Sequence, residues 1–200
     1  MSDPVAVVPV RTVAPKQRLA SVLSAADRGR LTVVLASHVV GCLLEAGLET
    51  LVLCLGELDI GHRIEVVRDE GPTINGALDR LIASLGRPVL VVAADLPYAT
   101  ARSVEEVLAE QGDVVVARTA DGGTGALLMR RPVRTAFGPR SALAHAWLAH
   151  QERLRTRVVE VDGLDRDLDD RAALTSAIAR APALRGWSLD GGARPPSPLA

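Results

Sequence analysis

The stretch PVLVVAADLP (88–97) decides the fold expected for this chain. Its first seven residues are apolar without interruption, which is typical of a strand covered on both faces in a parallel sheet. Asp95 follows at the carboxyl end of that strand, where a carboxylate is costly unless it meets a cation or hydrogen-bond donors. Mg²⁺ takes such oxygen ligands together with substrate phosphates, so Asp95 is a candidate metal ligand. The alternative is that Asp95 only caps the turn before Pro97.

Strands and helices alternate on both sides of this stretch. The apolar patterns predict strands at 5–10, 50–56, 64–67, 88–94, 113–119, 124–130 and 157–161, and helices at 31–47, 103–111, 139–150 and 169–180. Residues 69–86 are predicted to form a loop that runs into a further helix. Such alternation implies right-handed βαβ units, hence an α/β protein with a mostly parallel central sheet flanked by helices. We expect one domain over residues 1–181. The Pro- and Gly-rich residues 182–200 are expected to form a disordered tail.

Several local signals mark where helices begin. Ser24, with Asp27 three residues on, resembles an N-cap, and Ser103 with Glu106 resembles a capping box. Pro139 stands where a helix start tolerates proline. The helical spacing around Trp147 favours a core position over a base-stacking platform.

The composition excludes several classes of protein. The net charge is −1 over 200 residues, which provides no overall field for nucleic acid or for an anionic membrane. No stretch approaches the roughly 20 apolar residues that cross a bilayer, and no leader is recognised at the N-terminus. We therefore expect a cytoplasmic protein without nucleic-acid or membrane partners. Cys42 and Cys54 are expected to be buried thiols.

Polar loops follow the predicted strands at 11–18, 69–76, 95–100 and 119–125. In open α/β sheets ligands bind at the carboxyl ends of the strands, which is where these loops lie. The first loop carries Arg11, Lys16 and Arg18, three cations that could hold a triphosphate and neutralise a pyrophosphate leaving group. A solvated basic loop is the alternative. Lys16 is the only lysine, since the other 22 of the 23 basic residues are arginines.

A second acidic cluster lies near the C-terminal end. In an extended chain Asp165, Asp167 and Asp169 lie on one side, although Asp169 or Asp170 could instead cap the last helix. The glycine-rich loop at 121–127 could hold an anion or form a plain hairpin turn. Ser141 stands at a helix N-terminus, where phosphate binds readily. The four histidines lack metal-binding spacing and are expected at the surface or in the core. Neither GxxxxGK[ST] nor GxGxxG is present.

The order of these motifs resembles one enzyme family. The motifs are VPVR (8–11), Lys16-Gln-Arg18-Leu19, Ile74-Asn75-Gly76-Ala77-Leu78, Ala94-Asp95-Leu96-Pro97, Gly123-Thr124-Gly125, the segment 137–141 and Asp167-Leu168-Asp169. In this order they resemble the 2-phospholactate/phosphoenolpyruvate guanylyltransferases of coenzyme F420 biosynthesis, the CofC/FbiD family, over about residues 5–180. The chain departs from the family pattern at Arg11, Ala94 and Ala173.

The resemblance implies a GT-A-like nucleotidyltransferase that transfers GMP from GTP to phosphoenolpyruvate or 2-phospho-L-lactate and releases pyrophosphate, with Mg²⁺ as the metal and possible assembly as a homodimer. It implies Asp95 and Asp169 as metal ligands, and Lys16, Arg18 and Asp95 as catalytic residues. The implied nucleotide contacts are Arg11, Lys16, Arg18, Pro72, Asn75 and Gly76. The implied acceptor contacts are Arg11, Thr124, Gly125, Ala126, Gly138 and Ser141.

Two alternatives stay open at this point. A relative with the same fold could act on another acceptor, such as a molybdopterin or a sugar phosphate. The chain could also be an inactive nucleotide-binding scaffold, because its last motif has lost part of the family pattern. The presence of both Asp95 and Asp169 favours an active enzyme.

Overall fold

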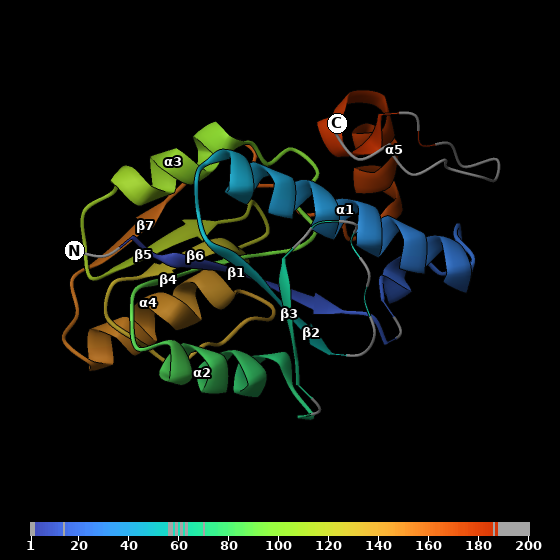
Figure 1. Cartoon of the computed structure of the whole chain (residues 1–200). Coiled ribbons are helices and arrows are strands. Elements are labelled where there is room, and N and C mark those ends of the chain that lie inside the picture. The colour runs from blue at the N-terminus through green and yellow to red at the C-terminus, as the bar shows by residue number, and fades with distance from the viewer. Residues whose placement is uncertain are drawn as a thin grey trace.

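A seven-stranded sheet with the order β3-β2-β1-β4-β6-β5-β7 forms the centre of the molecule (Figure 1). The computed structural model describes residues 3–13, 15–55, 58, 60, 62, 64–69, 71–185 and 187. The strands are β1 (Val5–Arg11), β2 (Thr50–Leu55), β3 (Glu65–Arg68), β4 (Val89–Val92), β5 (Val114–Arg118), β6 (Thr124–Met129) and β7 (Thr156–Val159). The first and last residue of each strand lie within two residues of the bounds predicted from the sequence.

All strands except β6 run in one direction. β1 pairs in parallel with β2 and β4, β3 with β2, and β7 with β5, whereas β6 is antiparallel to both β4 and β5. The carboxyl ends of the six parallel strands therefore share one edge of the sheet, and β6 begins at that same edge. This confirms the predicted α/β class with a mostly parallel sheet.

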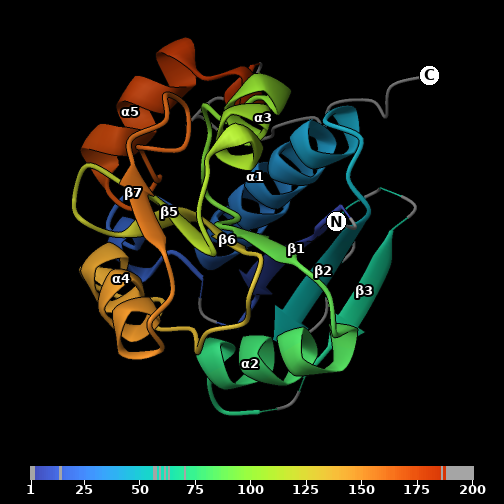
Figure 2. The same ribbon diagram turned by 90° about the vertical axis from the view of Figure 1, so that its left-hand side faces the viewer.

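Helices cover both faces of the sheet. α1 (Ala25–Glu45) and α3 (Ala101–Ala109) pack on one face, and α2 (Ile74–Leu85) and α4 (Ser141–Gln151) on the other (Figures 1 and 2). α5 (Arg171–Arg180) lies beside α1. Successive residues of a strand point to opposite faces, so a sheet covered in this way needs apolar residues at every position.

The central strand β4 shows this requirement directly. Leu90 and Val92 pack against the cluster that includes α1 and α3, while Val89 and Val91 pack against the cluster that includes α2 and α4. All four side chains are buried. The unbroken apolar run in the sequence thus reflects burial of this strand on both faces, as predicted.

A third apolar cluster joins the segment after β1 to the C-terminal part of the described chain. Leu19 and Leu168 pack with residues of α1 and α5, and with Leu184 of the 3-10 helix η2 (Pro182–Leu184) and Trp187. These last contacts follow position 181, where the sequence predicts the domain to end. Of the predicted tail, residue 186 and residues 188–200 lie outside the described residues.

The helix starts agree with the sequence in one case and differ in two. Ser24 caps α1 and accepts a hydrogen bond from the Asp27 amide at 3.1 Å, as predicted. The capping box assigned to Ser103 and Glu106 is wrong, because Thr100 caps α3 by accepting from the Ser103 amide at 3.1 Å. α4 begins at Ser141, two residues after Pro139.

Other core predictions have mixed outcomes. Cys42 and Cys54 are buried, as expected. Trp147 was predicted in the core but is 59% exposed, because it lies on the side of α4 turned away from the sheet. Within the described residues, no helix combines the length and apolar character needed to cross a membrane.

The cap of α3 can be tested by substitution. We expect Thr100→Ala to lower the free energy of unfolding by about 1 kcal/mol, because the Ser103 amide loses its acceptor. Glu106→Gln is the matched control, since Glu106 contacts exposed Arg102 and should change the free energy by less than about 0.5 kcal/mol. Urea denaturation measures both, and equal losses in the two variants would contradict the assignment.

Candidate active site

The pocket of interest lies where the connections of the sheet change direction. The chain leaves β1 for β2 and β3 on one side and returns to β4 on the other, so the carboxyl ends of β1 and β4 flank a crevice. A pocket of about 480 Å³ opens there. Its lining residues are Pro9, Val10, Arg11, Pro15, Lys16, Gln17, Arg18, Thr32, Leu35, Ile74, Ala93, Ala94, Asp95, Phe137 and Asp169. The volume suits a small-molecule ligand.

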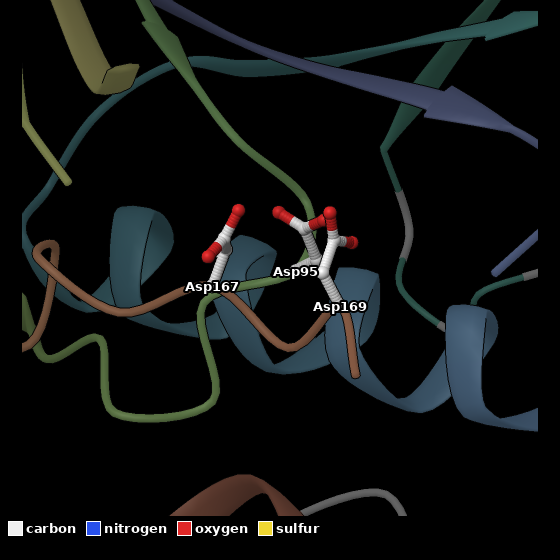
Figure 3. A group of neighbouring side chains, drawn as sticks. All are labelled: Asp95, Asp167 and Asp169. Atoms are coloured by element: carbon white, nitrogen blue, oxygen red, sulfur yellow. The ribbon is translucent and has the colours of Figure 1, made fainter. Parts of the chain in front are cut away.

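Three carboxylates gather at this pocket. Asp95 follows β4, while Asp167 and Asp169 come from the segment before α5 (Figure 3). One oxygen of each lies within 4.8 Å of the others. Leu168, between the two, buries its side chain and donates its amide to the Asp95 carbonyl at 2.9 Å. Asp167 and Asp169 therefore point to the side where Asp95 lies.

The prediction of an acidic cluster near the last helix is correct in part. Asp165 does not join the site, because its carboxylate accepts from the Gly163 amide at 3.2 Å and pairs with Arg166. Asp170 is the cap of α5 and accepts from the Ala173 amide at 2.8 Å. Asp167 was absent from the predicted metal ligands. The alternation of Asp165, Asp167 and Asp169 marked it as a candidate but did not distinguish it from Asp165.

The chemistry of this cluster suits a divalent cation. Its three donors are carboxylate oxygens, which hard ions such as Mg²⁺ prefer. Burial, together with the neighbouring Asp95 and Asp169 carboxylates, raises the pKa of Asp167 to about 6. Excess negative charge is thus concentrated at one point of the pocket wall.

Lys16 contacts two of the three carboxylates. Its Nζ lies 2.6 Å from Oδ2 of Asp95 and 3.2 Å from Oδ1 of Asp169, and its side chain is only 8% exposed. Burial alone would lower the Lys16 pKa, but the two carboxylates outweigh it and the pKa is raised. Arg18 approaches Asp169 at 3.4 Å from a largely exposed position, and Arg11 lines the same pocket.

The predicted nucleotide contacts in the 72–76 segment lie at the N-terminus of α2. The Asn75 side chain donates to the Phe137 carbonyl at 3.0 Å and accepts from the Phe137 amide at 2.7 Å. The Gly76 amide donates to the Thr73 side chain, which caps α2, and Pro72 is exposed. From the 72–76 segment only Ile74 lines the pocket, and Phe137, the partner of Asn75, lines it as well. Asn75 thus positions a pocket wall through its hydrogen bonds to Phe137.

The predicted acceptor residues Thr124 and Ser141 belong to a buried network behind that wall. Ser141 Oγ donates to Thr124 Oγ1 at 2.9 Å, and Thr124 Oγ1 lies 3.0 Å from Nδ1 of His145. Nε2 of His145 accepts the Ala136 amide at 2.9 Å, so the neutral ring carries its proton on Nδ1. His145 is fully buried, as a core histidine.

The remaining predicted acceptor residues have other surroundings. Ala126 is buried in β6, and Gly138 adopts a positive φ of 152° in the loop before α4. Gly125 has a specific steric role, because a Cβ added there would stand 2.0 Å from the Leu164 carbonyl oxygen. Gly163, with φ 86°, is equally constrained, since an added Cβ would stand 2.5 Å from the Tyr98 carbonyl oxygen. Only glycine permits these close approaches.

These approaches hold the segment that carries Asp167 and Asp169. We expect Gly125→Ala to lower the free energy of unfolding by about 1–3 kcal/mol and to weaken Mn²⁺ binding, because the Leu164 backbone must move. Gly41→Ala is the control, since nothing lies within 4 Å of its added Cβ, and it should match the wild type in metal binding. Calorimetric titration with Mn²⁺ measures the binding. Unchanged affinity in Gly125→Ala would show that the close approach of Gly125 to Leu164 does not position the metal ligands.

The buried network predicts a pH dependence. Burial lowers the pKa of His145 from 6.5 to about 4, so between these values the unfolded chain binds a proton that the folded chain does not. This contribution to stability is complete above pH 6.5 and is lost as the pH falls towards 4. The stability advantage of the wild type over His145→Asn should therefore shrink between pH 7.5 and 5 in urea unfolding. An advantage independent of pH would contradict the burial of a neutral ring.

Known proteins show the same combination of fold and sequence. The family model described as "Guanylyl transferase CofC like" matches residues 5–180. A 2-phospho-L-lactate guanylyltransferase of Halomicrobium mukohataei is 32% identical over 86% of this chain and 84% of its own length. A phosphoenolpyruvate guanylyltransferase of Roseiflexus sp. is 31% identical over 82% of this chain and 80% of its own length.

A solved structure extends the comparison to the fold. It is that of a proposed nucleotide-diphospho-sugar transferase from Desulfovibrio desulfuricans G20, which has a TM-score of 0.69 and 15% identity and covers 92% of this chain and 93% of its own. This similarity agrees with the nucleotidyltransferase type of α/β fold expected from the sequence. With the family model matching nearly the whole described chain, the assignment rests on sequence and fold together: the chain belongs to the CofC-like guanylyl transferase family.

Proposed function

We propose that this chain transfers the guanylyl group of GTP to phosphoenolpyruvate or 2-phospho-L-lactate and releases pyrophosphate, as a step in coenzyme F420 biosynthesis. The observation that carries the proposal is the meeting of Lys16, Asp95 and Asp169 in one pocket, in a chain of this family. Cations and carboxylates in one crevice are the groups that polyphosphate chemistry uses.

The cations of the first loop bind the polyphosphate in this proposal. Arg11, Lys16 and Arg18 line the pocket within a stretch of eight residues, and no other segment of the pocket wall contributes a cation among the described residues. Their charge offsets that of the triphosphate on binding. It also stabilises the charge that develops on the pyrophosphate leaving group.

The carboxylates hold the metal in this proposal. Asp95, Asp167 and Asp169 would hold Mg²⁺, extending the predicted pair by one residue. When bound, the ion supplies Lewis-acid neutralisation of phosphoryl oxygens. Leu168 and the Gly125 contact orient Asp167 and Asp169 beforehand, so these carboxylates need little rearrangement on binding.

The reaction itself needs no covalent enzyme intermediate. A phosphate oxygen of the acceptor forms a bond to the α-phosphorus of GTP, and the bond from that phosphorus to the bridging oxygen of the β-phosphate breaks. The electron pair leaves with pyrophosphate. The protein contributes orientation and charge neutralisation, which account for most of catalysis in phosphoryl transfer.

The acceptor side of the pocket is formed by Arg11 and the loop that contains Phe137 and Gly138. Phe137 lines the pocket, and Asn75 holds its backbone by two hydrogen bonds. Thr124, Gly125, Ala126 and Ser141 stay predicted acceptor residues. Thr124 and Ser141 are bonded in the His145 network, whereas Gly125 approaches Leu164 and Ala126 is buried in β6. Nucleotide contacts of Pro72, Asn75 and Gly76, assembly as a homodimer and a cytoplasmic location also stay predictions.

A matrix of substrates tests this function. The protein is incubated with Mg²⁺, each of the four NTPs in turn, and phosphoenolpyruvate, 2-phospho-L-lactate or 3-phosphoglycerate, and pyrophosphate release is followed. We expect release with GTP and one of the first two acids. Release with CTP or UTP only, or with another acceptor such as a sugar phosphate, would assign a different transferase. No release with any pair would favour an inactive nucleotide-binding protein.

The metal-binding carboxylate is tested by Asp95→Asn. We expect kcat to fall at least about 100-fold with the fold preserved, because the amide removes one charged oxygen ligand. Asp162→Asn is the matched control, since the Asp162 side chain is 93% exposed and pairs with Arg166. Circular dichroism and pyrophosphate release measure the two effects, and near-normal turnover in Asp95→Asn would mean that the metal binds elsewhere.

A further inference from the structure

We propose that Lys16 is an internal cation that holds the carboxylate cluster together in the metal-free protein, leaves it when a divalent ion binds, and is thereby released to contact the polyphosphate. The last of these steps rests on the proposed function. The first two concern only the chain and the metal, and can be examined without any nucleotide.

The position of the ammonium group is the first argument. Lys16 Nζ lies between Oδ2 of Asp95 and Oδ1 of Asp169, at 2.6 and 3.2 Å. Oxygens of these residues are also among those that converge within 4.8 Å in the cluster. An ammonium group and a metal ion would therefore compete for the same carboxylates.

Charge decides that competition. Three carboxylates face one buried ammonium, whose described contacts are with two of them, and the Arg18 side chain that also reaches Asp169 is 73% exposed. Exposed pairs of that kind contribute little. A divalent ion carries twice the charge of the ammonium and can accept an oxygen from all three residues, so it neutralises the cluster more fully.

The backbone of Lys16 allows the side chain to move by itself. Lys16 has the left-handed conformation, with φ 49° and ψ 46°, immediately before the 3-10 helix η1 (Gln17–Leu19). Its carbonyl accepts from the Leu19 amide at 2.9 Å, and the neighbouring Pro15 carbonyl accepts from Arg28 Nε at 3.2 Å. These bonds hold the loop in place, so the release needs only rotation of the four-carbon stem.

The sequence supplies an independent reason for a lysine at this position. The other 22 basic residues of the chain are arginines. An ammonium is a compact point charge on a flexible stem, which suits exchange between carboxylate and phosphate oxygens. A planar guanidinium forms bidentate bonds to carboxylates that would resist such exchange. Position 16, whose side chain changes partners in this proposal, thus carries a lysine.

Because Lys16 is the only lysine, its reactivity reports directly on its surroundings. The full chain is treated with a limiting amount of an acetylating succinimidyl ester, with and without saturating Mg²⁺, and modification of Lys16 is followed by peptide mass spectrometry. We expect Lys16 to react roughly fivefold faster or more with Mg²⁺, because the ion frees it from its carboxylates. An unchanged or slower rate would overturn the proposal.

An internal reference removes any general effect of the metal on the reagent. Arg102→Lys places a second lysine on α3, where the side chain is 86% exposed and outside the pocket. Its rate of modification should be the same with and without Mg²⁺. The ratio of the two rates in one sample therefore reports the release of Lys16 alone.

Metal affinity provides a second measurement. Lys16→Gln removes the competing cation, so Mn²⁺ should bind roughly fivefold more tightly or better in calorimetric titration, while the metal-free protein loses stability from unbalanced carboxylates. Lys16→Arg retains a competing charge and should bind Mn²⁺ no more tightly than the wild type. Equal or weaker Mn²⁺ binding in Lys16→Gln would contradict the competition, whatever the catalytic rate.

A third arm separates this proposal from the proposed function. Adding a non-hydrolysable GTP analogue to the Mg²⁺-bound protein should slow the modification of Lys16 again, because its ammonium then contacts the polyphosphate. Continued rapid modification at saturating analogue would overturn the delivery step. Release of Lys16 by Mg²⁺ in a protein that shows no turnover with any substrate pair would instead refute the proposed function and leave the exchange intact.

Discussion

Mutual repulsion among three carboxylates at the end of a buried strand is the constraint on which the site depends. Asp95, Asp167 and Asp169 lie close enough to share one cation, and the partly buried position of Asp167 makes its ionisation costly. Lys16 offsets part of this charge from the adjacent loop. Repulsion between the carboxylates therefore remains in the metal-free protein, and a more highly charged ion would reduce it.

The fold resists this repulsion through backbone contacts. The Leu168 amide is bonded to the Asp95 carbonyl, and Gly125 lets the chain at Leu164 approach β6 without steric conflict. Leu168 and Leu164 are themselves buried in apolar clusters, so moving the acidic segment would expose apolar surface. Carboxylates that would otherwise separate are kept together by packing that has no part in the chemistry.

The two sides of the pocket are built differently. On the charged side, the functional groups line the cavity directly. They are Lys16 and Arg18 of the first loop, together with Asp95 and Asp169. The opposite side presents Phe137, and its polar residues act from behind through Asn75 and the Thr124, Ser141 and His145 network. Motif residues in such a wall can be essential without touching a ligand, because they set the position of the backbone that does.

Much of this protein could be predicted from the sequence because the physical causes are local. The unbroken apolar run before Asp95 indicated a strand buried on both faces, and the helix start at Ser24 and the acidic alternation around Leu168 are equally short-range signals. The cap of α3 was misplaced because Thr100 and Ser103 are both acceptable caps, and the contact of Ser103 with the distant Asp162 carbonyl distinguishes them.

Only the tertiary structure decided that Asp167 and not Asp165 joins Asp95, that Asn75 is bonded to Phe137, and that Lys16 is paired with carboxylates 79 and 153 residues away. The sequence by itself thus determined the strand and the carboxylate at its end, whereas the partners of that carboxylate depend on contacts between segments that no local pattern can specify.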